Sequence, residues 1–188
     1  MVTFKFNEIK TTQAVALFLE KDAGKMNYMK LIKLLYLVDR EALRLWERPL
    51  TGDTYVSMKH GPVLSNVYDI ITNGEDPADN SYWYKHITAQ SNYNVELKED
   101  LPILDELSKR ELELIGKVYE EYKDFDRWKM VDICHEILPE WENVGNTCKP
   151  IRINTILKKV DKSKEEIQKI EEEVLDLNDV KKLLSIDD

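Results

Sequence analysis

Glycine and cysteine are scarce in this chain, and their scarcity excludes several classes of protein. Only six of the 188 residues are glycine, and neither a phosphate-binding loop nor a dinucleotide fingerprint is present. The two cysteines, Cys134 and Cys148, are too few for a disulfide-rich fold, and their spacing matches no common zinc pattern. We therefore expect a protein with no bound cofactor or metal.

Long apolar runs are also absent. No window approaches the roughly 18 to 20 unbroken apolar residues of a membrane span, and the segment from Met1 to Asn7 lacks the apolar region of a signal peptide. Hydrophobic residues at 43% and charged residues at 34% are typical of a globular protein. The composition predicts a cytoplasmic protein with reduced thiols and no membrane contact.

The charge is unevenly distributed. The formal net charge is −9, with +3 in residues 1–60 and −12 in residues 61–188. An acidic surface repels phosphate backbones, which makes nucleic acid an unlikely principal ligand. The small basic region could pair with the acidic half of the same chain, bind an acidic protein or touch nucleic acid, and we rank these in that order.

The longest helical pattern runs from Tyr28 to Trp46, which has neither glycine nor proline and carries an apolar stripe. Asp39 projects from that stripe, where an unpaired carboxylate would be costly. It either binds a buried partner, such as Arg40 or a backbone amide of the 49–55 loop, or meets a basic group of a partner; the first is favoured. The opposite side carries four cations, Lys30, Lys33, Arg40 and Arg44, with Leu37 among them.

Local signals predict further elements. We expect one helix from about Glu8 to Lys21 and another from Val63 to Thr72. Ser108 and Glu111 fit a capping box that starts a helix reaching about Tyr122, and Asp124 or Asp126 can cap the next helix, which must end near Leu138 because Pro139 follows. Helices are also expected over much of 151–188. Tyr82 to Thr88 and Asn92 to Lys98 are β-prone and predict a hairpin, with another extended segment at Thr54 to Met58. The chain should be a predominantly helical α+β protein with five to seven helices and a two- or three-stranded antiparallel sheet. We expect one domain over 1–150 and a charged helical extension, 151–188, packed on it.

Several segments that follow one another along the chain together carry a family resemblance. They are residues 30–40, 48–55, 60–63 and 67–69, then Trp128 and residues 135–141. In this order and spacing the chain resembles the Panacea domain, a family also described as SocA-like antitoxins and as phage-associated proteins. The resemblance implies an antitoxin of a toxin–antitoxin system, with a role in phage defence, that neutralises a protein toxin by direct contact. It also leaves open a proteolytic adaptor that delivers the toxin to a protease, a phage-associated regulatory protein, and a homo-oligomer.

A partner surface is expected on the basic side of the central helix. We expect Lys33, Leu37 and Arg40, with Tyr55 and His60 from the following loop, to lie on or beside the toxin-binding surface. The competing interpretation makes this side internal, covered by the acidic C-terminal helices. Structural roles are expected for the remaining motif residues, which are Asp39, Gly52, Gly61, Pro62, Tyr68, Asp69, His135 and Trp141.

A hydrolase or nuclease built from His60, Asp69 and His135 is the rival from another class. The three histidines of the chain have none of the spacing of a helical metal motif. On a helix, adjacent Cys134 and His135 point about 100° apart and do not readily act on one target. We therefore expect no catalytic residues and no convergence of the three side chains in one cleft.

Overall fold

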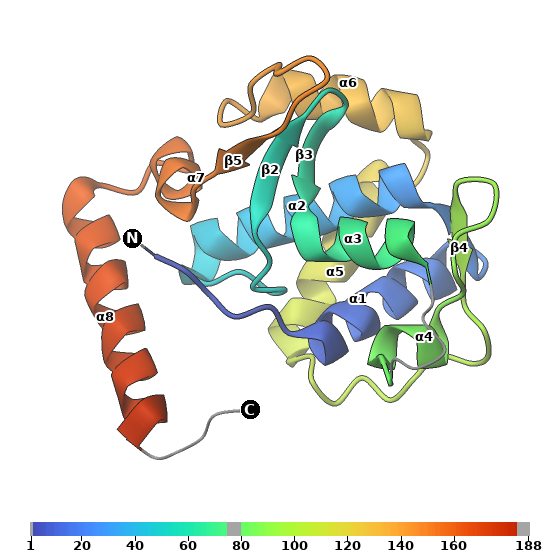
Figure 1. The fold of residues 1–188 in the computed structure, drawn as a ribbon, viewed down its shortest axis with the longest axis horizontal. Coiled ribbons are helices and arrows are strands. Elements are labelled where there is room, and N and C mark those ends of the chain that lie inside the picture. The colour runs from blue at the N-terminus through green and yellow to red at the C-terminus, as the bar shows by residue number, and fades with distance from the viewer. Residues whose placement is uncertain (1, 75–79, 184–188) are drawn as a thin grey trace.

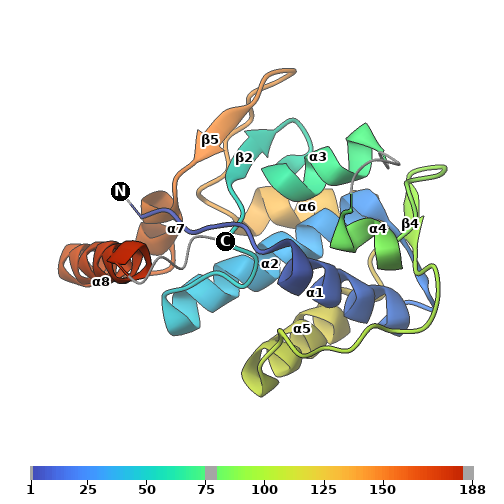
Figure 2. The ribbon, with the colours of Figure 1, turned by 60° about the horizontal axis from the view of Figure 1, so that its bottom comes forward.

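The computed structural model describes residues 2–74 and 80–183, with side chains through residue 177. These residues form eight helices, with α2 (Tyr28–Trp46) at the centre, and two small antiparallel sheets, so the fold is α+β and mostly helical, as predicted, with one helix more than expected. Figures 1 and 2 show α1 and α5 on one side of α2, and α6 with strands β2, β3 and β5 on the other. The helices are α1 (Glu8–Lys21), α2 (Tyr28–Trp46), α3 (Ser65–Asn73), α4 (Tyr82–His86), α5 (Lys109–Tyr122), α6 (Arg127–Ile137), α7 (Ile153–Lys159) and α8 (Lys164–Leu183).

Local capping groups start most of these helices. The side chain of Asn27 accepts a hydrogen bond from the Met29 amide at the start of α2, and Asp126 accepts from the amides of Trp128 and Lys129 at the start of α6. Ser108 and Glu111 form the predicted capping box of α5. The predicted bounds of α1 and α2 agree with those in the structure and are confirmed.

The strands form two sheets. In the larger one, β2 (Tyr55–Met58) lies between β3 (Gly61–Leu64) and β5 (Lys149–Ile151). The smaller sheet pairs β1 (Lys25–Asn27) with β4 (Asn94–Glu96). Only Lys59 and His60 connect β2 to β3, and this hairpin lies beside α6 (Figure 1).

The start of α3 differs from the prediction. Pro62 and Val63 belong to strand β3 and not to a first helical turn, and the helix begins at Ser65. The physical reason is a remote cap. Both Asp53 carboxylate oxygens accept backbone amides of the first turn, from Asn66 at 2.9 Å and Val67 at 3.1 Å.

The predicted hairpin over residues 82–98 is largely wrong. Tyr82–His86 is a short helix, because the Glu8 carboxylate accepts from the Trp83 amide at 2.9 Å and the Trp83 side chain is fully buried. The second segment does form a strand, but its partner is β1. A single bridge between Ile87 and Leu97 is all that remains of the expected pairing.

Residues after 150 pack on the rest of the chain. The proposed boundary at residue 150 falls inside β5, which pairs with β2. Lys162 binds Glu47 at the end of α2, at 2.7 Å, and Figures 1 and 2 show α8 beside α7 and the N-terminal segment. Through residue 177, the buried side chains of α8 are Ile167, Ile170 and Val174. Residues 184–188 of the expected extension lie outside the described part.

Candidate partner-binding site

The basic side of α2 is covered by other elements. Lys33 is 1% exposed and Leu37 is 7% exposed, so their expected place on the surface is wrong. Lys30 is also buried, and its ammonium donates to the carbonyl of Lys123 at 2.7 Å. The covering segments include β3, α6 and the 123–126 connection. The side is therefore internal, and of the C-terminal helices α7 packs on α2, where the Lys159 carbonyl accepts a hydrogen bond from Arg40.

Arg40 holds a buried carboxylate. Its Nε lies 2.8 Å from Glu140 Oε1, which also accepts from the Tyr36 hydroxyl at 3.1 Å. The Glu140 side chain is fully buried, whereas that of Arg40 is 19% exposed. A buried carboxylate needs such a counter-charge, which explains why Arg40 points inward and not toward a partner.

Asp39 makes the contacts of the structural interpretation. It is fully buried and accepts from the amides of Leu50 at 2.7 Å and Thr51 at 2.9 Å, from the Thr51 hydroxyl, and from the Tyr55 hydroxyl at 2.9 Å. Burial nevertheless raises the pKa of Asp39 to about 6, because loss of solvation outweighs these bonds. Tyr55 is thus buried as a hydrogen-bond donor to Asp39, and its expected surface position is wrong.

Two glycines of the motif are required by close approach. At Gly52 (φ +69°), an added Cβ would lie 2.2 Å from the carbonyl oxygen of Lys5. At Gly61 (φ +99°), it would lie 3.1 and 3.2 Å from Cε and Nζ of Lys33. Gly61 thereby leaves room for a buried ammonium that donates to the Pro62 carbonyl at 2.7 Å.

Lys33 forms part of the wall of a small apolar pocket, here called the Lys33 pocket. Its volume is about 160 Å³, and it lies between the first turns of α2, the β2–β3 hairpin and α3. Burial lowers the pKa of Lys33 to about 8. The lining includes a second cation and no carboxylate; it consists of Tyr28, Met29, Ile32, Lys33, Met58, Lys59, His60, Val63 and Tyr68.

An aromatic surface surrounds the mouth of this pocket. Tyr93 is 61% exposed and Trp128 is 49% exposed. The Arg127 guanidinium lies 5.8 Å from the first ring and 5.2 Å from the second. Tyr93 packs against Tyr28 at 6.1 Å, and Trp128 against His60 at 5.6 Å. We call Tyr28, His60, Tyr68, Tyr93, Arg127 and Trp128 the aromatic surface.

The residues of the hydrolase hypothesis do not line a common cavity. His60 lines the Lys33 pocket, whereas Asp69 lines a separate hollow with Glu8 and Asn73. His135 stacks on Trp141 at 3.8 Å, and the Trp141 indole donates to the Met58 carbonyl at 2.9 Å. Among the described residues, no group of three His, Cys, Asp or Glu side chains is placed to hold a metal ion.

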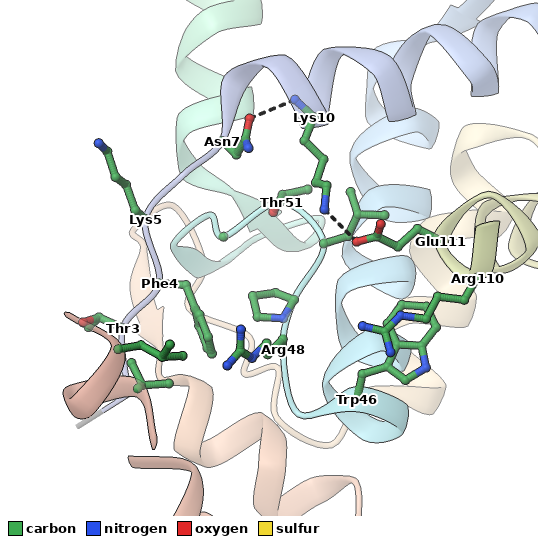
Figure 3. Close-up of a pocket in the computed structure, with 15 residues that line it drawn as sticks. Thr3, Phe4, Lys5, Asn7, Lys10, Trp46, Arg48, Thr51, Arg110 and Glu111 are labelled. Carbon is green, nitrogen blue, oxygen red and sulfur yellow. Dashed lines mark hydrogen bonds and ion pairs between the residues drawn. The ribbon is translucent and has the colours of Figure 1, made fainter. Parts of the chain in front are cut away.

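A larger hollow, here called the N-terminal basin, lies near the other end of α2 (Figure 3). Its volume is about 430 Å³, and its cations are Lys5, Lys10, Arg48 and Arg110. Lys10 pairs with Glu111 at 2.9 Å, and Arg110 stacks on Trp46 at 4.6 Å. Figure 3 shows Lys10 reaching down to Glu111, and Lys5 pointing away from the hollow. The sequence patterns did not indicate this basin, because its walls come from four separate stretches of the chain.

The family comparison now has its structural context. The model of the family described as antitoxin SocA-like, Panacea domain, matches residues 31–142. The chain belongs to this family. No curated protein and no solved structure matches the chain.

The matched region of the Panacea domain runs from α2 through α6 and includes most of the Lys33 pocket and aromatic surface. The N-terminal basin draws several walls from outside it, namely the N-terminal segment and α8. No helix in the described part of this Panacea protein is long and apolar enough to cross a membrane.

Proposed function

We propose that this protein is the antitoxin of a toxin–antitoxin pair, that it neutralises a protein toxin by direct binding, and that the aromatic surface is the centre of the contact. Membership of the SocA-like antitoxin family supports a toxin partner. The single observation that supports this position for the contact is the exposure of Tyr93 and Trp128, which pack on Tyr28 and His60 at the wall of the Lys33 pocket.

The composition of this surface supports a protein contact. Tyrosine, tryptophan, arginine and methionine are the residue types most enriched where protein interfaces are buried. All four occur here: Arg127 lies against two aromatic rings, and Met29 and Met58 line the pocket between them. Large exposed aromatic side chains cost little to desolvate and give much contact area.

The expected partner residues of the sequence take different places in this proposal. His60 belongs to the surface through its contact with Trp128, and Lys33 lies beneath it in the pocket. Leu37, Arg40 and Tyr55 act from inside the fold and hold the loops that carry the surface. Direct blocking then requires no contact from these three.

The test uses the product of the open reading frame adjacent to this gene as the probe. We expect that product to stop growth alone and to be harmless with the antitoxin. Trp128→Ala should weaken binding about 30-fold or more, the equivalent of roughly 2 kcal/mol at a central interface residue. Calorimetry with the two purified proteins measures the affinity, and a thermal melt checks that the variant is folded.

Ile103→Ala is the matched control, because Ile103 is an exposed hydrophobic residue outside this surface. It should leave both rescue and affinity unchanged. Full rescue and unchanged affinity in a Trp128→Ala, Tyr93→Ala double variant would overturn the proposed surface. Loss of the toxin from cells that carry the antitoxin and a protease, with no stable complex, would favour the adaptor role instead.

A further inference from the structure

Lys33 is a buried cation without a carboxylate partner. Its ammonium has three N–H donors, and the one hydrogen bond found for it in the described part of the chain goes to the Pro62 carbonyl. No carboxylate of the described residues lies within ion-pair distance of it. A buried charge in this condition is costly unless something pairs with it.

The nearest titratable neighbour does not supply a counter-charge. Burial raises the pKa of the Cys134 thiol to about 11, so the thiol is neutral near pH 7. The pKa of Lys33, lowered to about 8 by burial, still leaves most of the ammonium protonated at that pH. The wall of the pocket therefore contains a buried positive charge, and the exposed Lys59 adds a second one.

The pocket has the size of a single side chain. A cavity of about 150 Å³ holds a benzene molecule, and the Lys33 pocket measures about 160 Å³. Ile32, Val63 and the two methionines supply apolar walls for an aliphatic stem. The volume and lining of the pocket thus favour a side chain with an apolar stem and a negative charge at its tip.

We propose that the Lys33 pocket receives one aspartate or glutamate side chain of the bound toxin, whose carboxylate pairs with the Lys33 ammonium. This inference rests on the proposed function, since the aromatic surface forms the mouth of the pocket. When the toxin covers that surface, water is excluded and the ion pair becomes stronger. The aromatic surface then supplies contact area, and the pocket selects toxins that carry a suitably placed acid.

Lys33→Met tests the pairing, because it keeps the length of the side chain and removes the charge. We expect at least 30-fold weaker binding to the product of the adjacent open reading frame. The melting temperature should be unchanged or raised, because a buried unpaired charge is lost. A merely structural lysine would instead lower the melting temperature.

Lys30→Met is the matched control. Lys30 is also buried on α2 and also donates to a backbone carbonyl. It lines a different hollow, which contains Asp22 and Asp126 and shares Arg127 and Trp128 with the aromatic surface, so this variant tests whether the loss of any buried charge beneath that surface weakens binding. Its replacement should change toxin affinity less than threefold. Equal losses of affinity from both variants would show a general effect of α2 and overturn the inference.

The pH dependence gives an independent readout. Between pH 7.5 and 9, affinity of the wild type should fall by up to tenfold per pH unit above about pH 8, as free Lys33 loses its proton. Lys33→Met should lack this component. The variant keeps every other titratable group that faces Lys33, so the difference in pH dependence between wild type and variant reports on Lys33. These groups are Tyr28, Lys59, His60, Tyr68, Cys134 and His135.

The acid on the toxin is found by replacing each of its aspartates and glutamates with the amide. One replacement should weaken binding to the wild type and have no further effect on Lys33→Met. If Trp128→Ala weakens binding but Lys33→Met and every toxin variant do not, the inference fails and the proposed function stands. If the wild type does not bind the product at all, the proposed function itself fails.

Discussion

A hollow with basic side chains lies near each end of α2, but the surroundings of the cations differ between the two hollows. At the Lys33 pocket one buried ammonium lies among apolar side chains with no carboxylate at hand. At the N-terminal basin the cations line a larger hollow, where Lys10 is paired with Glu111, Arg110 is stacked on Trp46 and Lys5 points away. A cation in solvent has little to gain from a new partner, whereas a buried unpaired one has much. The contrast is why we assign recognition to the smaller hollow.

The largest expected effect is the loss of stability on replacing Arg40, a largely buried cation of α2, compared with the loss on replacing Arg44, an exposed one. Arg40→Glu places a second carboxylate against buried Glu140 and should cost about 3 to 5 kcal/mol of unfolding free energy. Arg44→Glu removes a surface pair with Glu41 and should cost less than about 1 kcal/mol. Urea unfolding of both variants measures the difference. Equal stabilities would mean that Arg40 faces solvent, as the sequence first suggested.

The next effect compares the two glycines beside the hollows. Gly52→Ala, next to the basin, would push a methyl group into the backbone carbonyl of Lys5 and should cost about 3 kcal/mol or more. Gly61→Ala, next to the Lys33 pocket, meets the flexible end of Lys33 and should cost about 1 to 3 kcal/mol. Thermal melts give the order of the two. A Gly61 variant less stable than the Gly52 variant would contradict the assigned contacts.

The smallest effect concerns the loop that Asp39 holds between the two hollows. Its pKa of about 6 in the folded protein exceeds the ordinary value of 3.8, so the folded state binds this proton more tightly than the unfolded state. The stability due to this group is fully present below about pH 4 and is lost as the pH rises through about 6. The advantage of wild type over Asp39→Asn should therefore shrink by about 1 to 3 kcal/mol between pH 4 and pH 7.

Unfolding of both proteins across this range checks the sign. Other carboxylates, such as Glu111, have a lowered pKa, so their contribution to stability rises with pH. This contribution is the same in wild type and variant. Their contributions cancel in the difference. A constant difference would show that Asp39 ionises as easily in the folded protein as in the unfolded one.

Elements with local signals were predictable from the sequence. Asn27 caps α2 from the adjacent position, the capping box of α5 spans four residues, and α6 ends before Pro139. Elements with remote signals were not. The cap of α3 is Asp53, and the cap of α4 is Glu8, which lies 75 residues from Trp83 in sequence.

The same distinction explains the candidate site. Helical periodicity assigns charged side chains to water, and for Arg44 that holds. Lys30, Lys33 and Arg40 turn inward because their acceptors come from Lys123, Pro62 and Glu140. Nothing in the sequence of α2 indicates those partners. The aromatic surface was equally hidden, because Tyr93 and Trp128 are far apart in the sequence and are brought to either side of Arg127 only by the fold.

Strand β5 has a consequence for any shortened form of the protein. It lies beyond residue 142, where the family match ends, yet it pairs with the outer side of β2. A chain cut before Lys149 would leave the backbone N–H and C=O groups of β2 open along that side. Such an unpaired strand is a template for association with other chains. In the full chain β5 is the edge strand on that side, and it carries Lys149 and Pro150, residue types that discourage pairing at an edge. A fragment defined by the family limits alone should therefore aggregate more readily than the full chain.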